Sequence, residues 1–357
     1  MKGRAACPLC EVLPTFPDRT KVLLVYTEPD LLFNKVLECL LGSGYKPEAQ
    51  DEIVVLRDVP TKDVLLTLKQ CCLSELETRE IKVALLEDEK YGIGLLKSFK
   101  PLEVWLSYIE NQDFFSILRN GSMTVYYQPI LNYEERRVHG YECLLRAFKE
   151  DGSMVPPYWL FETAKKTGML FYLDREARQV AIKEASKKVR GDEKVFINFT
   201  PTSIYDPAYC LKTTIEFACT IGVEPSKLVF EVVETDKVED KKHLRTILEY
   251  YRSHGFRVAL DDVGEGYSSL NLLIWLNPDY VKLSIELVRD IHKVSIKKDF
   301  VSALFSSLRK NGIEVIAEGV ETKEELNQLL DIGVRLFQGF LFAKPAPEPN
   351  HVINWQD

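Results

Sequence analysis

Short apolar runs alternate with amphipathic segments from about residue 120 to residue 340. The apolar runs are rich in Val, Ile, Leu and Phe, which is typical of buried strands. The segments between them carry apolar residues at helical spacing, and the predicted helices span Pro157–Thr167, Arg175–Lys188, Lys241–His254, Ile285–Asn311 and Thr322–Ile332. Strands that alternate with helices predict a parallel sheet, and about eight of them predict a closed barrel.

The start of this barrel is predicted to be irregular. Met123–Leu131 is the first of the predicted strands, and only the short polar turn Asn132–Arg137 separates it from the second. Such a turn leaves no room for a crossover helix, so it joins antiparallel neighbours. We therefore expect an α/β fold with a (β/α)8-like, TIM-type barrel whose first strand is antiparallel, preceded by a small α/β N-terminal domain.

Two adjacent carboxylates, Asp261 and Asp262, end one of the apolar runs. Neighbouring side chains on a strand point to opposite faces, so both can serve one site only where the strand ends. A helix N-cap followed by a solvated loop is the alternative for this segment alone. Other predicted strands also carry polar residues near their ends, namely Glu142 and Arg146, Asn198, Glu231 and Glu234, Lys282, Glu318 and Glu321, and Gln338. Because charged residues are rarely buried unless they are paired or bind metal, this repetition predicts a shared polar site.

Residues from about 120 to 350 resemble an EAL domain, the cyclic di-GMP phosphodiesterase module of bacterial signalling. The resemblance rests on an ordered series of motifs, Tyr127-Gln-Pro-Ile130, Gly140–Arg146, Asn198-Phe-Thr-Pro201, Glu231–Glu234, Asp261–Leu270, Asp279–Lys282, Ala317–Thr322 and Gln338-Gly339. It implies a metal-dependent enzyme that hydrolyses cyclic di-GMP to linear pGpG. The alternative is a catalytically weak or inactive EAL domain that acts as a cyclic di-GMP receptor. A glycosidase with two paired carboxylates is disfavoured by the additional acids, the lysine and the asparagine.

The resemblance also implies roles for individual residues. One divalent cation would be held by Glu142, Asn198, Glu231 and Asp261, and a second by Asp261, Asp262 and Glu318. Lys282 would orient the attacking water, Glu318 would be the candidate base, and Glu321 would brace the loop after Asp262. The substrate would be seated by Gln128, Arg146 and Gln338. Carboxylate and amide oxygens suit Mg²⁺ or Mn²⁺, and the lack of a His cluster argues against zinc at this site.

Five residues depart from the family pattern, and two of them, Cys143 for a usual Ala and Lys165 for a common acid, are expected to be tolerated. Val263 and Glu265 stand where Phe and Thr are usual, and Ser284 replaces a usual Asp after Lys282. We expect the Glu265 carboxylate to face solvent and the changes to affect turnover more than metal binding. In the family the loop after Asp262 takes part in dimer-linked activation, so the resemblance also implies a homodimer through the EAL domain.

The chain before the barrel predicts a second domain. We divide the sequence into a tail (1–18), a small α/β regulatory or sensory domain (19–100), a connecting helix (101–118) and the EAL domain (119–350). The predicted elements of the small domain are strands Lys21–Tyr26, Ile53–Leu56 and Ile81–Leu86 and helices Asp30–Leu41 and Thr61–Leu76. This order fits a receiver-like or a ferredoxin-like domain, and no motif identifies the signal that it would sense.

Cysteine content, net charge and apolar stretches bear on the compartment and the binding partners of the protein. Most of the eight cysteines lie in apolar patterns without a signal peptide, so we expect a reduced, cytoplasmic protein. Cys7 and Cys10 form a CxxC that could supply half of a Zn²⁺ site, with Cys71 and Cys72 as the other half; a flexible tail with two free thiols is the alternative. A net charge of −8 without a basic run argues against duplex nucleic acid. No apolar stretch approaches the roughly 20 residues of a membrane span.

Overall fold

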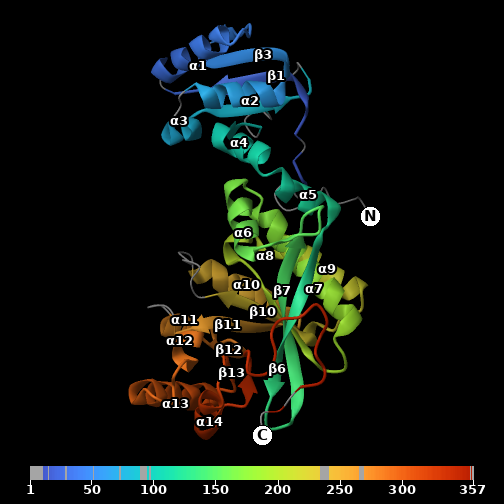
Figure 1. The fold of residues 1–357 in the computed structure, drawn as a ribbon, viewed down its shortest axis with the longest axis vertical. Helices are drawn as coiled ribbons and strands as arrows, with labels where there is room; N and C mark the ends of the chain where they lie inside the picture. Colours follow the sequence, from blue (N-terminus) through green and yellow to red (C-terminus); the bar gives the residue numbers. More distant parts are fainter. Residues whose placement is uncertain are drawn as a thin grey trace. The chain divides into compact units, whose positions relative to one another are not determined.

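A computed structural model describes residues 11–14, 16–28, 30–50, 52–71, 74–88, 95, 98–233, 241–264, 269–353 and 355. The chain divides into two compact units, whose elements are labelled in Figure 1. The first unit comprises Met1–Gly121, Lys149–Ser153 and Tyr158–Leu170. The second unit comprises Ser122–Phe148, Met154–Pro157 and Phe171–Asp357.

A five-stranded antiparallel sheet forms the core of the first unit, with the strand order β2-β3-β1-β4-β5. The elements are β1 Arg19–Tyr26, α1 Asp30–Gly42, β2 Glu48–Gln50, β3 Ile53–Pro60, α2 Thr61–Gln70, α3 Glu75–Glu80, β4 Lys82–Leu86, β5 Lys100–Pro101, α4 Leu102–Glu110 and α5 Gln112–Asn120. A receiver needs a parallel sheet, so the antiparallel pairing excludes that alternative. The order β2-β3-β1-β4 with α1 and α2 as connections is ferredoxin-like.

Two expectations for this unit need correction. The helix predicted from Thr61 to Leu76 is two helices, because Ser74 and Glu77 form a capping box that starts α3. A disulfide joins Cys39 of α1 to Cys71 at the end of α2. These two cysteines are therefore oxidised, whereas reduced cysteines were expected. The two Cα atoms lie 6.0 Å apart, within the usual range for a disulfide. The remaining residues of the proposed Zn²⁺ site, Cys7, Cys10 and Cys72, lie outside the described residues.

The second unit is a closed eight-stranded barrel, which confirms the predicted fold class. The strand order around it is β6-β14-β13-β12-β11-β10-β9-β7, and β6 pairs with β7 to close it. The strands are β6 Met123–Asn132, β7 Arg137–Phe148, β9 Lys194–Asn198, β10 Leu228–Val233, β11 Arg257–Val263, β12 Tyr280–Leu283, β13 Glu314–Ala317 and β14 Leu336–Phe337, with β8 Met154–Val155 attached to β7. As predicted, β6 is antiparallel to both neighbours, whereas the other neighbouring strands of the barrel are parallel.

Helices connect most of the parallel strands on the outside of the barrel (Figure 1). They are α7 Leu170–Lys188, α8 Pro207–Cys210, α9 Lys212–Thr220, α10 Lys241–Ser253, α11 Ser269–Leu276, α12 Ile285–Val288, α13 Ser295–Lys310 and α14 Lys323–Ile332. The helix α6 Pro157–Lys166 belongs almost entirely to the first unit. Phe230 of β10 stacks on Tyr251 of α10 with ring centroids 4.0 Å apart, which illustrates how outward strand residues pack against this layer. Each such fully buried side chain stabilises the fold by about 1.5–3 kcal/mol.

One predicted helix of the barrel is wrong in its extent. The expected helix Ile285–Asn311 is interrupted between α12 and α13, where Asp290 adopts a φ of 55°. The Asp290 N–H donates to Glu325 Oε1 at 3.0 Å, so a tertiary contact satisfies an amide that lies in this break. Helical periodicity alone does not reveal such a break.

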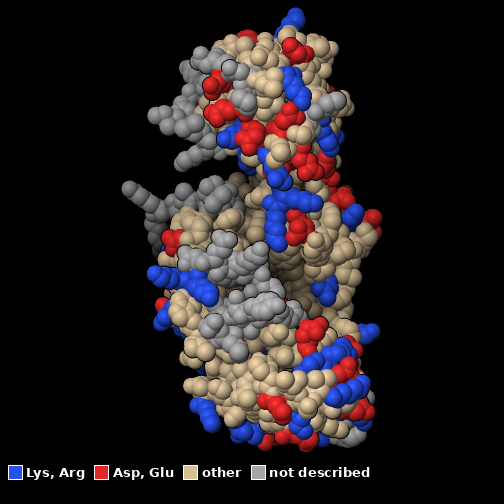
Figure 2. Space-filling model, turned by 90° about the vertical axis from the view of Figure 1, so that its left-hand side faces the viewer, with Lys and Arg blue, Asp and Glu red and all other residues tan. Residues whose placement is uncertain are grey.

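The surface carries charges of both signs. On the face shown in Figure 2, Lys and Arg side chains are interspersed with Asp and Glu side chains. A mixed surface of this kind differs from the basic stripe of proteins that bind duplex nucleic acid. None of the helices within the described residues is long and apolar enough to cross a bilayer.

Candidate functional site

The predicted site residues lie one layer above an apolar layer inside the barrel. On six of the parallel strands one predicted site residue follows an apolar interior residue by two positions, and the period of a strand places both on the same face. The pairs are Phe196 and Asn198, Val229 and Glu231, Ala259 and Asp261, Tyr280 and Lys282, Ile316 and Glu318, and Leu336 and Gln338. On the antiparallel β6 the order is reversed, so Gln128 precedes Ile130. Strand geometry therefore gathers these polar side chains at the carboxyl ends of the parallel strands.

The Lys282 ammonium lies at the centre of this site. Its Nζ is 2.7 Å from Glu318 Oε1, 2.9 Å from Glu231 Oε1, 3.2 Å from Asp261 Oδ1 and 3.3 Å from Glu142 Oε2. The lysine side chain is only 1% exposed, so the four carboxylates rather than water compensate its charge. Burial would lower the pKa of Lys282, but these acids raise it well above its usual value.

Glu142 and Glu231 contact the same ammonium but differ in hydrogen bonding. Glu142 accepts hydrogen bonds from Asn198 Nδ2 at 2.9 Å and from Gln338 Nε2 at 2.6 Å. Although burial favours the neutral acid, the Lys282 charge and these donors hold the pKa of Glu142 below its usual value. Glu231 is fully buried, and apart from its ion pair with Lys282 its oxygens accept no hydrogen bond from the described residues. Burial therefore raises the pKa of Glu231 well above its usual value.

Asp261 and Asp262 reach the same site because the backbone turns between them. Asp262 has a φ of 53°, a left-handed value that is uncommon outside glycine, and its N–H donates to Asp261 Oδ1 at 2.9 Å. Both residues belong to β11, so the alternative of a helix N-cap does not apply. Oxygens of Asp261, Asp262 and Glu318 lie within 4.8 Å of one another. Burial and the Asp261 charge raise the pKa of Glu318 well above its usual value.

This donor set fits a hard divalent cation. Three carboxylates from β11 and the end of β13 converge, and the buried Glu231 has oxygens that lack hydrogen-bond donors among the described residues. A buried carboxylate without such donors is costly unless a positive charge lies beside it. In this structure Lys282 provides that charge, and its contacts link residues of both predicted cation sets.

The predicted substrate-binding residues are only partly brought together. Gln128, Gln338 and Glu321 line one hollow of about 280 Å³, together with Glu142, Asp262 and Glu318. Arg146 lies away from it, with its guanidinium over the Tyr126 ring, 5.0 Å from the centroid. Arg146 shares a face of β7 with Glu142, about 13 Å of extended strand away, and its role in seating the substrate stays a prediction.

Glu321 has a different environment from the other acids. Its side chain is 39% exposed, and it accepts a hydrogen bond from Arg289 Nη1 at 2.6 Å. This ion pair lowers the pKa of Glu321. The loop that Glu321 was expected to brace includes Glu265, which lies outside the described residues.

Sequence reasoning missed three residues around the hollow, Arg289, Ile285 and Phe340. Ile285 and Phe340 are 39% and 53% exposed and line it directly. Phe340 follows Gly339, where a Cβ would lie 2.1 Å from Val320 O, so the backbone approach at this point requires glycine. An aromatic residue directly after the Gln-Gly pair was the available sequence signal, whereas nothing local marks Arg289.

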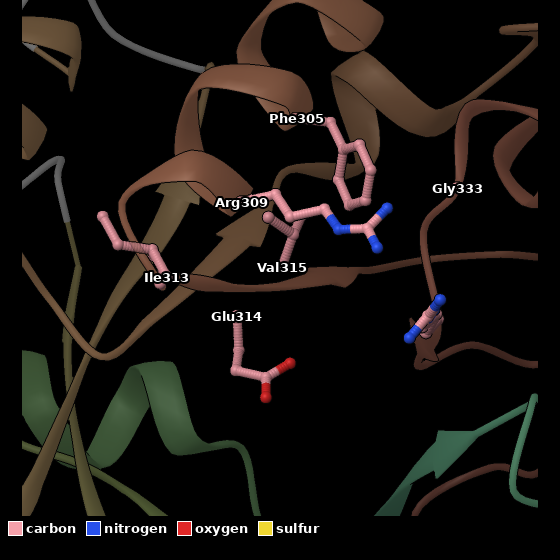
Figure 3. Close-up of a pocket in the computed structure, with 8 residues that line it drawn as sticks. Phe305, Arg309, Ile313, Glu314, Val315 and Gly333 are labelled. Carbon is pink, nitrogen blue, oxygen red and sulfur yellow. The ribbon is translucent and has the colours of Figure 1, made fainter.

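A second hollow, of about 230 Å³, lies at the opposite end of the barrel. Figure 3 shows its lining, which includes Phe305, Arg309 and Glu314. Glu314 begins β13, so this hollow is at the amino ends of the strands. Barrel enzymes place their chemistry at the carboxyl ends, so the hollow beside Lys282 is the candidate active site.

The comparison with protein families decides the assignment. The family model described as "EAL domain" matches residues 111–345. The chain belongs to the EAL domain family. The resemblance inferred from the ordered motifs is thereby confirmed.

Curated relatives agree with this assignment. The chain is 30% identical over 233 residues to "Probable cyclic di-GMP phosphodiesterase PdeG" of Escherichia coli (strain K12), which covers 64% of this chain and 46% of that protein. It is 29% identical over 234 residues to "Cyclic di-GMP phosphodiesterase PdeR" of the same organism, covering 64% and 35%. The chain thus matches less than half of the length of either relative.

Solved EAL structures share the fold. A standalone versatile EAL protein from Vibrio cholerae O395, in its c-di-GMP bound form, aligns with a TM-score of 0.59 and 33% identity over 66% of this chain and 96% of that one. The "Klebsiella pneumoniae BlrP1 pH 8.0 calcium/cy-diGMP complex" aligns with a TM-score of 0.59 and 23% identity over 94% of this chain and 100% of that one. At this identity the second likeness shows the fold alone, and it extends over nearly the whole chain.

Proposed function

We propose that the chain is a divalent-metal-dependent phosphodiesterase that hydrolyses cyclic di-GMP to linear pGpG. The observation that carries this proposal is the convergence of four carboxylates on the buried Lys282 at the carboxyl ends of the strands. EAL domains that lose catalysis would be expected to lack acids or the lysine, and here all are present. The relatives named as cyclic di-GMP phosphodiesterases support the choice of substrate.

Two divalent cations, Mg²⁺ or Mn²⁺, complete the proposed site. Glu142, Asn198, Glu231 and Asp261 would hold one, and Asp261, Asp262 and Glu318 the other. Bound cations would lower the pKa of water and neutralise charge on the phosphate oxygens. The manganese and calcium complexes of Klebsiella pneumoniae BlrP1 are in keeping with this class of cofactor.

The side chains of the site would divide the remaining work. Lys282 would orient the attacking water, and Glu318, whose Oε1 lies 2.7 Å from Lys282 Nζ, would accept its proton. Gln128 and Gln338 would seat the substrate in the hollow that they line. Arg146 would also help to seat the substrate, and Glu321 would brace the loop after Asp262.

The N-terminal region would regulate this activity. We propose a tail over residues 1–18, a regulatory domain over 19–100, a connecting segment over 101–118 and the EAL domain over 119–350. The connecting segment contains two helices, α4 and α5, rather than one. A homodimer through the EAL domain is part of the same proposal.

Two substitutions test the catalytic proposal against a receptor function. Glu142→Gln and Asp261→Asn should abolish formation of pGpG, because each removes a charged oxygen ligand. Lys212→Met is a matched control, since Lys212 pairs with Glu216 on the surface. A receptor would instead bind cyclic di-GMP without turnover in the unaltered chain, which calorimetry and product chromatography distinguish.

A further inference from the structure

A buried carboxylate on α7 holds the turn that follows Asn198. The side chain of Asp174 is 3% exposed. Its Oδ1 accepts a hydrogen bond from the Thr200 N–H at 2.7 Å, and its Oδ2 accepts one from Ser203 Oγ at 2.6 Å. Thr200 comes two residues after Asn198, and Ser203 ends the 3-10 turn Pro201–Ser203. Asp174 thus fixes the backbone directly beyond the end of β9.

Arg178 completes this buried network from the next turn of α7. It pairs with Asp174 Oδ2, and its Nε donates to Thr214 Oγ1 of α9 at 3.3 Å. Both charged side chains are almost fully buried and compensate each other. A buried ion pair is weak evidence for stability, because apolar residues of similar volume often stabilise a fold as well or better.

We propose that Asp174 is a positioning residue for the metal site, acting through Asn198. The strand β9 ends at Asn198, so the direction of this side chain depends on how the following turn is held. In the observed position Asn198 Nδ2 donates to Glu142 Oε1 at 2.9 Å, which leaves Asn198 Oδ1 as the oxygen for a cation. This role rests on the proposed function, which supplies the cation. It adds to the site a residue that lies outside the proposed sets of metal ligands and substrate-binding residues.

Substituting Asp174 should weaken metal binding although Asp174 is not one of the proposed metal ligands. Asp174→Asn keeps the shape of the side chain but removes the charge that pairs with Arg178. Partners of metal ligands typically change metal affinity 10–100-fold when they are mutated, so we expect Mn²⁺ affinity to fall by about tenfold. Ser203→Ala removes the hydroxyl that lies 2.6 Å from Asp174 Oδ2 and 2.7 Å from Thr200 O but keeps the ion pair, so it is the gentler variant, with a smaller loss in the same direction.

The full chain should be titrated with Mn²⁺, and the free ion followed by electron paramagnetic resonance. Thermal unfolding of each variant would be recorded alongside. Glu193→Gln is the matched control, because Glu193 directly precedes β9 and accepts the Arg190 N–H at 2.8 Å, at the other end of the same strand. We expect this control to bind Mn²⁺ like the unaltered chain.

The outcomes separate the two proposals. If Asp174→Asn and Ser203→Ala lower the unfolding temperature but bind Mn²⁺ like the unaltered chain, Asp174 is merely structural and the positioning role is wrong. If Asp174→Asn does not fold, Ser203→Ala decides, since it retains the ion pair. If the unaltered chain itself binds no Mn²⁺, the proposed metal-dependent function fails and the positioning role fails with it.

Discussion

Replacing Lys282 with Met removes the only cation, among the described residues, in contact with four carboxylates, three of them buried and the fourth, Glu318, 15% exposed. Met retains an unbranched apolar side chain, so the change in packing is small. Removing one partner of a buried ion pair typically costs about 3–5 kcal/mol, because the other charge is left uncompensated. With all four carboxylate contacts at 3.3 Å or less and the lysine 1% exposed, we expect a loss of this size at pH 8 without divalent cations.

The loss should depend on pH. The pKa values of Glu231 and Glu318 are already raised in the folded chain by burial, and losing the ammonium raises them further. A carboxyl group with a raised folded-state pKa contributes stability below its unfolded pKa, about 4.5, and loses it as pH rises through the folded value. The variant should therefore approach the unaltered chain toward pH 4.5 and fall below it as pH rises.

Urea unfolding followed by circular dichroism, in EDTA at pH 5 and pH 8, would measure this effect. Lys212→Met is the control, because a surface pair such as Lys212–Glu216 contributes at most about 1 kcal/mol. Added Mn²⁺ should restore part of the stability of Lys282→Met by binding only the folded state. A Lys282→Met variant that unfolds with the unaltered chain at pH 8 would refute the charge compensation.

Three further predictions concern separate features. Burial lowers the pKa of His139 to about 4, so between pH 6.5 and pH 4 the unfolded chain binds a proton that the folded chain does not bind. The contribution of His139 should lower the free energy of unfolding by about 3 kcal/mol as pH falls over this range. Urea titrations at pH 7 and pH 4 should show a smaller drop for His139→Phe than for the unaltered chain. Glu142→Gln should retain the native circular dichroism spectrum yet form no pGpG, and turnover near normal would contradict the metal assignment. Gly339→Ala should cost about 1–3 kcal/mol in urea unfolding, because its Cβ would lie 2.1 Å from Val320 O, and an unchanged midpoint would show that this approach is not rigid.

The barrel and most of its site could be predicted because both depend on local periodicity. Polar residues placed two positions after an interior apolar residue must share its face, so Glu231, Asp261 and Lys282 were bound to converge once the strands were recognised. The short turn before β7 likewise forced β6 to be antiparallel. The positive φ of Asp262 explains why two adjacent acids serve one site.

Other features depend on contacts between segments far apart in sequence. The break at Asp290 needs Glu325, and the disulfide needs Cys39 and Cys71 to be placed on neighbouring helices. The role of Arg146, which shares a face of β7 with Glu142, stays a prediction.

The most direct test of the proposed function is product formation by the purified chain. Cyclic di-GMP would be incubated with the metal-stripped chain, with EDTA and then with Mn²⁺ or Mg²⁺, and the products separated by chromatography. We expect pGpG only when a divalent cation is present, with EDTA abolishing its formation. Tight binding of cyclic di-GMP without any pGpG in either metal would contradict the phosphodiesterase and favour a receptor.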